Sequence, residues 1–261
     1  MKRYSILHPL YLSFFSRDLY RDVRTNWKGT GFLYLLLLLS ITWLPVMYKL
    51  HFGISKGVQQ EAPKYLDQVP KITIVRGEVS IDRPVPYTIS DPDSRTPLMV
   101  IDTSGTISSL EQTTALALLT KNKFMYRQAH GAETRIYDLS QIDAFTLDRD
   151  LVNEWVQAFR KFFAALAYPF ALAASFAYRV LQLLLYAALG MLFVSMLKVP
   201  LDYLAVLRLA SVSITPAIIL STLRTLTGLH VPALWLVCFV IAMGYLFFAV
   251  KANPVPAPEA P

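Results

Sequence analysis

The chain has little cysteine, and its few histidines are not clustered. The one cysteine, Cys238, lies in an apolar run. A single cysteine excludes an internal disulfide and a cysteine-based zinc site. The histidines stand far apart, without HxH or HxxxH spacing: His8, His51, His130 and His230. We therefore expect no metal site and no other cofactor.

Charge is also scarce. Charged residues make up 16% and hydrophobic residues 54% of the 261 residues, whereas about a quarter of a soluble domain is charged. A bilayer core of about 30 Å requires roughly 20 apolar residues per helix. Four runs of such length carry almost no charge: 31–50, 162–197, 209–229 and 231–250. They predict an α-helical, multi-pass membrane protein with four transmembrane helices.

The basic residues predict which ends of the chain face the cytoplasm. Residues 1–30 hold six Lys/Arg and two Asp, a bias that keeps a segment in the cytoplasm. With the first transmembrane helix at 31–50, residues 51–150 are expected outside, as a small, mostly β extracytoplasmic domain between helices 1 and 2. We assign the net charge of +7 to contacts with membrane lipids rather than nucleic acid.

The second apolar run is too long for one crossing, because 36 helical residues extend about 54 Å. We expect an interfacial amphipathic helix at 151–168, a new start at Pro169, and the second transmembrane helix within 169–197. The remaining expected parts are a cytoplasmic loop at 198–208, transmembrane helices at 209–230 and 231–250, and a disordered proline-rich tail at 251–261. The tryptophans are expected at membrane interfaces: Trp27, Trp43, Trp155 and Trp235.

Between 70 and 150 the pattern becomes that of short strands. Segments rich in Val, Ile, Thr and Tyr alternate with turn signals. A short helix is expected within 108–117, capped by Ser108 or Ser109. The predicted strands are 71–75, 79–82, 86–89, 97–102, 115–120, 123–127 and 134–139.

The stretch VIDTSGTI (100–107) is the one place that resembles a catalytic motif, because an aspartic-protease strand also ends in Asp-Thr before a glycine. Those enzymes need two carboxylates that share a proton. This chain has one such loop, with an extra residue before Gly105. We interpret Asp102 and Gly105 as a structural turn; a membrane-bound hydrolase that uses Asp102 is a remote alternative.

Two arginines, Arg179 and Arg224, are the charged residues within or at the edge of the later crossings. Simple anchoring at the outer interface is one interpretation; a pair that binds an anionic lipid head group is the other. Arg160 and Lys161 are further candidates for head-group or partner contacts. In the third helix, Thr215-Pro216 predicts a bend.

Several segments carry a family resemblance. FFSRDLYRDVRTNWKGTGFLYLLLLLSI (14–41), VRGEVSID, VIDTSG and LRLASVSITPAIIL (207–220) resemble the bacterial domain-of-unknown-function 1189 family over nearly the whole chain. Val212-Ser213 stands where Tyr-Ala is more usual. The resemblance implies a bacterial cytoplasmic-membrane protein with no assigned chemistry. Some relatives accompany maltodextrin-uptake genes, which implies an accessory role.

These observations favour a protein that is not an enzyme. We expect an accessory or scaffold protein of the bacterial cytoplasmic membrane, with both termini in the cytoplasm. Its external domain would bind an envelope or membrane protein. A lipid-handling or transporter subunit is the alternative.

Overall fold

The computed structural model describes residues 3–128 and 133–253; His130 and most of the predicted tail lie outside this range. The chain divides into two compact units, Met1–His51 with Phe163–Pro261, and Phe52–Phe162, and each is described by itself.

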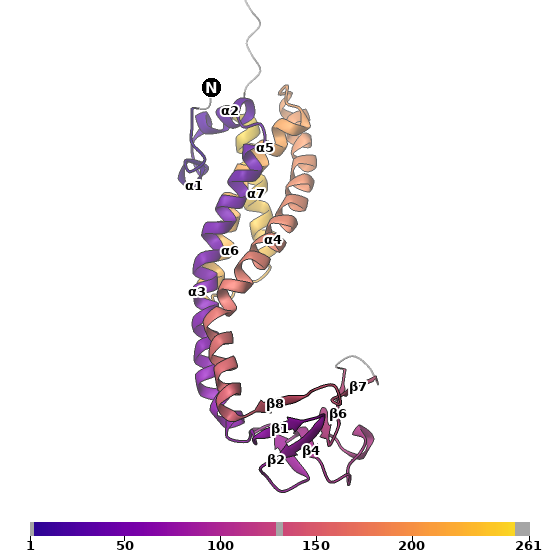
Figure 1. Ribbon diagram of the computed structural model, residues 1–261. Helices are drawn as coiled ribbons and strands as arrows, with labels where there is room; N and C mark the ends of the chain where they lie inside the picture. Colours follow the sequence, from indigo (N-terminus) through magenta and orange to yellow (C-terminus); the bar gives the residue numbers. More distant parts are fainter. Residues whose placement is uncertain (1–2, 129–132, 254–261) are drawn as a thin grey trace, which may run out of the picture. The chain divides into compact units, whose positions relative to one another are not determined.

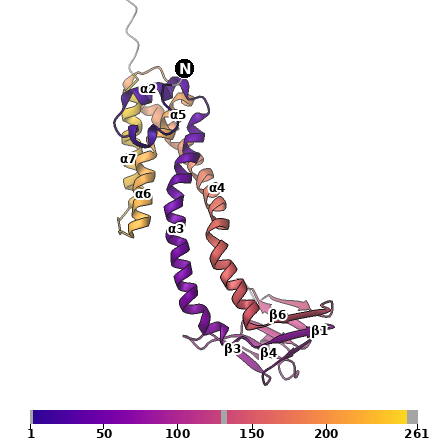
Figure 2. The same cartoon turned by 60° about the vertical axis from the view of Figure 1, so that its left-hand side comes forward.

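The predicted fold class is confirmed (Figures 1 and 2). A β region, residues 72–147, lies in the sequence between the first and second of four long apolar helical segments. Within the described residues, these segments are long and apolar enough to span a membrane: Thr30–Leu66, Arg149–Leu197, Tyr203–Thr227 and Leu234–Lys251. They are the helices of a multi-pass membrane protein.

The described residues form seven α-helices. Two short ones precede the first long helix, and the third apolar segment consists of two consecutive helices. Their bounds are α1 Pro9–Leu12, α2 Arg17–Asn26, α3 Thr30–Leu66, α4 Arg149–Leu197, α5 Tyr203–Ser213, α6 Thr215–Thr227 and α7 Leu234–Lys251.

Large apolar side chains remain uncovered on the long helices. Leu185 is 67% exposed, Met196 74% and Trp235 75%. Soluble monomers rarely expose large contiguous apolar surfaces. Lipid chains would cover these side chains in a bilayer.

The N-terminal segment and the end of α7 lie at the same end of the helical bundle (Figure 1). Arg21 Nε donates to the carbonyl of Ala252 at 2.9 Å. Arg24 donates to the carbonyl of Pro200 at 3.0 Å and accepts, through its own carbonyl, a hydrogen bond from Arg208. Arg21, Arg24 and Arg208 therefore connect backbone segments that are far apart in the sequence.

Trp27, one of the tryptophans expected at a membrane interface, packs inside the helical unit, and its depth in a membrane stays a prediction. Its side chain is wholly buried, and its indole N–H donates to Asp22 Oδ2 at 3.1 Å. The Asp22 carboxylate also accepts from Asn26 and from the backbone N–H groups of Arg3 and Tyr4. The buried Trp27 indole therefore has a polar partner within the protein, as buried indoles usually do.

The break expected at Pro169 is wrong, because α4 is one continuous helix of 49 residues. The interfacial helix at 151–168 and the second transmembrane helix are parts of this single element. Proline removes one hydrogen bond and disturbs the preceding turn, but intrahelical hydrogen bonds on both sides are retained in apolar surroundings, where backbone groups have no water to bind.

The third segment begins earlier than expected. The predicted loop 198–208 is helical from Tyr203 onward, because Asp202 caps α5 by accepting from the N–H of Ala205 at 3.1 Å. An interruption is present at Ile214, which separates α5 from α6. Thr215 and Pro216, where a bend was predicted, are the first two residues of α6; the bend itself stays a prediction.

All seven predicted strands form, and an eighth was missed. The missed strand, β8, includes Phe145. A 3₁₀ turn, Leu110–Gln112, is capped by Ser109, as expected for this segment. The strands are β1 Ile72–Val75, β2 Glu78–Ile81, β3 Tyr87–Ser90, β4 Pro97–Asp102, β5 Ala117–Thr120, β6 Lys123–Arg127, β7 Thr134–Asp138 and β8 Ala144–Leu147.

The strands form two sheets that share a core. Three strands have the order β2-β1-β8 and five have the order β3-β4-β5-β6-β7. Among the described strands, β4 and β5 pair in parallel and the other pairs are antiparallel. Ile72, Ile74 and Val79 of the smaller sheet pack with Ile101 and Leu119 of the larger one.

A second apolar cluster lies on the other face of the five-stranded sheet. It combines Val100, Leu118 and Met125 of the strands with Leu110 and Ala115 of the connection between β4 and β5. This connection is the crossover that a parallel pair requires.

Residues 51–66 correct the predicted start of the β-rich domain. They continue α3 as helix, and the first strand begins at Ile72. The segment has many helix-forming residues and no alternating β-branched run. Glu61 and Lys64 also form an i,i+3 ion pair of 2.8 Å on its surface, an arrangement that favours a helix.

Candidate functional site

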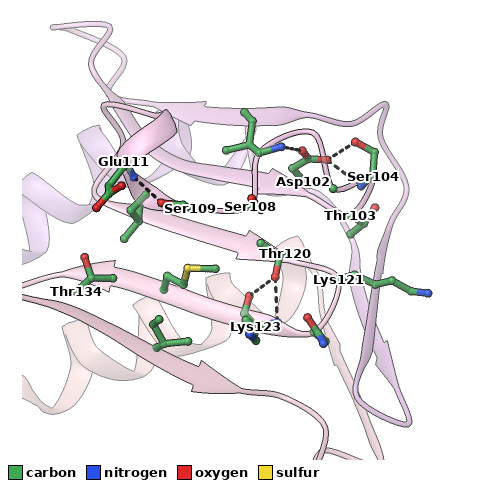
Figure 3. Close-up of a pocket in the computed structure, with 16 residues that line it drawn as sticks. Asp102, Thr103, Ser104, Ser108, Ser109, Glu111, Thr120, Lys121, Lys123 and Thr134 are labelled. Carbon is green, nitrogen blue, oxygen red and sulfur yellow. Dashed lines mark hydrogen bonds between the residues drawn. The ribbon is translucent and has the colours of Figure 1, made fainter.

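Asp102 lies at the end of β4, beside a hollow of about 550 Å³ in the β region (Figure 3). Its side chain is wholly buried. Oδ1 accepts from the N–H of Ser104 at 2.8 Å and from its hydroxyl at 2.6 Å, and Oδ2 accepts from the N–H of Ile107. Gly105 completes the turn with a φ of +86°, which glycine adopts without steric cost.

These contacts favour the ionised carboxylate. Burial alone raises the pKa of Asp102, but hydrogen bonds from Ser104, Ile107 and Gly105 outweigh it, and the pKa lies below its ordinary value. A carboxylate held ionised by three donors is a turn cap. A protease-like dyad instead needs a partner carboxylate that shares a proton.

Glu111 lines the same hollow, but no hydrogen bond joins it to Asp102 among the contacts of the described residues. The described residues also contain no group of three or more His, Cys, Asp or Glu that could hold a metal ion.

The far side of the hollow consists of the turn between β5 and β6 and of the edge strand β7 (Figure 3). Thr120 Oγ1 accepts from the N–H of Lys123 at 3.1 Å, which fixes the turn. The Lys121 ammonium forms an ion pair with the Glu78 carboxylate, with Nζ 3.2 Å from Oε1. Thr134 and Ile136 of β7 complete the lining, so the hollow extends to the outermost strand of the sheet.

A second pocket lies within the helical bundle, where it brings Arg179 of α4 and Arg224 of α6 together. Its volume is about 940 Å³. Sequence reasoning named both arginines for their scarcity, but 45 residues separate them and only the packing of α4 with α6 and α7 places them in one pocket. His230, which no pattern indicated, also lines it.

The other two candidate cations, Arg160 and Lys161, do not line this pocket. They lie in the other unit, on the early part of α4, where the Lys161 ammonium is 5.3 Å from the Phe162 ring. Trp155 and Phe159, one turn away, line an apolar groove with residues of α3.

Thr215 serves the helix interruption. Its hydroxyl donates to the carbonyl of Val212 at 2.7 Å and lies 2.7 Å from the hydroxyl of Tyr34. Val212 is four residues before Pro216, which has no N–H to donate. The buried threonine therefore binds a carbonyl that the proline leaves without its usual helical partner.

The chain belongs to the DUF1189 family, described as a protein of unknown function, whose model matches residues 7–250. The resemblance found in the sequence is confirmed. Neither a curated protein nor a solved structure matches the chain.

Proposed function

We propose that this family member is a non-enzymatic accessory protein of the bacterial cytoplasmic membrane. In this proposal both termini are cytoplasmic, residues 51–150 lie outside, and the β region binds an extended segment of an envelope or membrane protein. The observation that carries the proposal is the free edge of the five-stranded sheet at β7.

Strand β7 is open on one side. Of the described strands, β6 alone pairs with it, and all five of its residues are exposed. An edge strand presents backbone N–H and C=O groups that another extended chain is able to pair with.

The register shows which backbone groups point outward. Leu139 donates its N–H to Asn122, and Gln128 donates to Glu133. Hydrogen-bonded and non-hydrogen-bonded pairs alternate in an antiparallel ladder, so the non-hydrogen-bonded residues of β7 present their backbone groups at the free edge. These residues are Thr134, Ile136 and Asp138.

The hollow beside β7 supplies a place for a partner side chain. Ile136 is 59% exposed and lines the hollow together with Met125. In strand addition, backbone hydrogen bonds supply affinity and pockets for alternate side chains supply specificity. We therefore propose that the partner contributes an extended segment with an apolar side chain opposite Ile136.

A proline at position 136 tests this assignment. Ile136→Pro removes an outward N–H but no hydrogen bond to β6, a position at which edge strands accept proline. Ile136→Ala is the matched control, because it shortens the side chain and keeps the N–H. In cross-linking of the full-length chain in intact cells, we expect Ile136→Pro to reduce β7 cross-links to the partner at least tenfold.

The Ile136→Ala chain should keep most of those cross-links, and both variants should unfold thermally within a few degrees of the wild type. Cross-links at wild-type yield in a folded Ile136→Pro chain would contradict the proposal. A β region that cross-links to no other protein would contradict it as well.

The geometry of Asp102 supports the non-enzymatic part of the proposal. Both of its carboxylate oxygens accept hydrogen bonds from its own loop. A hydrolase would need this group to exchange a proton with substrate.

A further inference from the structure

We propose that the pocket between α4, α6 and α7 binds the phosphate group of an anionic membrane phospholipid through Arg179 and Arg224. This inference concerns the helical unit and a different ligand, so it does not depend on the partner proposed for β7.

The first observation is the lack of a countercharge. Between residues 155 and 253 the only acidic residue is Asp202, which caps α5. No ion pair involves Arg179 or Arg224 within the described part of the chain. Two cations that share a pocket among apolar helices are costly unless an anion pairs with them.

The second observation is how Arg179 is held. Its Nη1 donates to Gln182 Oε1, and Gln182 Nε2 in turn donates to the hydroxyl of Tyr186 at 2.6 Å. The Nε atom of Arg179 is buried and has no hydrogen-bond partner among the residues that the structure describes. The neighbouring residues thus orient the guanidinium and leave a buried donor for a ligand. Buried donors in native proteins are normally paired.

The third observation separates Arg224 from a neighbouring cation. Lys49 lies at the same end of the bundle, but its ammonium donates to the carbonyls of Thr225 and Leu226 at 2.7 and 3.0 Å. It therefore caps the last turn of α6. The Arg224 side chain makes no such contact among the described hydrogen bonds and lines the pocket instead.

Two arginines match a phosphate better than other anions of similar size, because guanidinium groups bind phosphate oxygens through paired, charge-assisted hydrogen bonds. His230 adds a further polar group to the same lining.

The apolar part of the lining identifies a membrane lipid as the source of the phosphate. Leu234, Leu236 and Phe239 of α7 line the pocket beside the arginines. Trp235 and Tyr178 at its rim are 75% and 62% exposed. Amphipathic rings are typical of the head-group level of a bilayer, and exposed apolar helix surface is where acyl chains would lie.

Lipid binding by the purified full-length chain tests the proposal. Native mass spectrometry and a fluorescent-lipid displacement assay would compare phosphatidylglycerol with phosphatidylcholine, using Arg179→Gln, Arg224→Gln and wild type. Loss of a charge-assisted contact weakens binding about tenfold or more. Lys161→Gln is the matched control, because it removes a positive charge of α4 outside the pocket.

We expect wild type and Lys161→Gln to prefer phosphatidylglycerol, and each arginine variant to bind it at least tenfold more weakly without a change for phosphatidylcholine. Arg179→Lys should recover part of the affinity, since it keeps the charge but not the planar fork. The Arg224 side chain makes no hydrogen bond to the other described residues, so Arg224→Gln remains informative if Arg179→Gln fails to fold.

Equal affinity for the two lipids would overturn the proposal, as would a loss in Lys161→Gln as large as in the arginine variants. Inorganic phosphate and glycerol phosphate form the second arm of the test. Displacement of the lipid by either at micromolar concentration would show that the pocket takes a soluble phosphate instead; lipid retained at millimolar concentration of both supports a membrane source.

Discussion

Asp102 is a buried carboxylate whose two oxygens accept hydrogen bonds from its own loop. The carboxylate ends a strand inside the β region and organises the loop that follows, through Ser104 and Ile107. The loop covers the apolar cluster around Val100 and Leu110. The residue that most resembles a catalytic group therefore links a strand to the cover of the sheet.

Replacing Asp102 tests this role. Asp102→Asn keeps the size of the side chain but loses its charge. In the wild type the loop donors meet two carboxylate oxygens, whereas in the variant one of these positions is an amide NH₂ group that cannot accept a hydrogen bond. We expect the variant to be less stable by about 1–3 kcal/mol at pH 7. Chemical or thermal unfolding of the full-length chain in micelles measures the difference.

The pH dependence gives a second readout. The folded-state pKa of Asp102 is depressed, so its stabilisation is present above the unfolded value of about 3.9 and is lost as pH falls through the folded pKa. The gap between wild type and Asp102→Asn should hold from pH 7 to about pH 5 and narrow below about 3.9. Asp143→Asn, at an exposed position, is the control. A gap that widens on acidification would show that the ionised form is not the stabilising one.

At the scale of elements, sequence patterns predicted strands better than helix ends. The seven strand segments carry β-branched and aromatic residues between turn signals such as Arg76-Gly77, and these are local properties. The missed strand, Ala144–Leu147, has a weaker local pattern and pairs with β1 at the far end of the region. This pairing of residues about 70 positions apart is not readable from either segment alone.

The predicted helix boundaries were derived from the length of one membrane crossing, and the observed α3 and α4 are longer than that. A bilayer limits how many residues cross it, but not how far a helix continues beyond it, and α3 and α4 have 37 and 49 residues. Pro169 predicts a boundary because proline disfavours helix interiors, whereas apolar surroundings favour keeping the remaining helical hydrogen bonds.

Gly190 lies where α4 packs closely against α5 and α7. A Cβ atom placed there would lie 2.7 Å from Val206 Cγ1 and 2.8 Å from Leu246 Cδ2. We expect Gly190→Ala to destabilise the bundle by about 1–3 kcal/mol, the usual cost of overpacking. Unfolding of the full-length chain in mixed micelles measures it.

Gly244 of α7 is the matched control, since no atom lies within 4 Å of a Cβ built there. Gly244→Ala should be neutral or stabilise the helix by up to about 1 kcal/mol. Equal free energies of unfolding for the two alanine variants would contradict the close approach of α4 to α5 and α7.

At the scale of the whole molecule, the arginines make different contacts at the two ends of the helical unit. At the end that holds the N-terminal segment, Arg21, Arg24 and Arg208 bind backbone carbonyls. Near the C-terminal end of α6, Arg224 and the α4 residue Arg179 line a pocket whose described lining contains no Asp or Glu. Composition identified the scarce charges as notable; their convergence required tertiary packing.

The same unit supports the proposed threading. The N-terminal segment and the end of α7 meet at one end of the bundle. The chain between them therefore crosses an even number of times, which is consistent with four spans. In the proposed threading, the basic bias of residues 1–30 keeps this end in the cytoplasm and residues 51–150 are outside.

Labelling of single cysteines in intact cells tests this placement most directly. In a Cys238→Ala background the chain has no other cysteine, and Gln141 and Lys28 are exposed positions in the β region and the N-terminal segment. With a membrane-impermeant maleimide, a cysteine at 141 should react before lysis and one at 28 only after it. The reverse pattern would place the strands inside the cell and contradict the binding of an envelope partner.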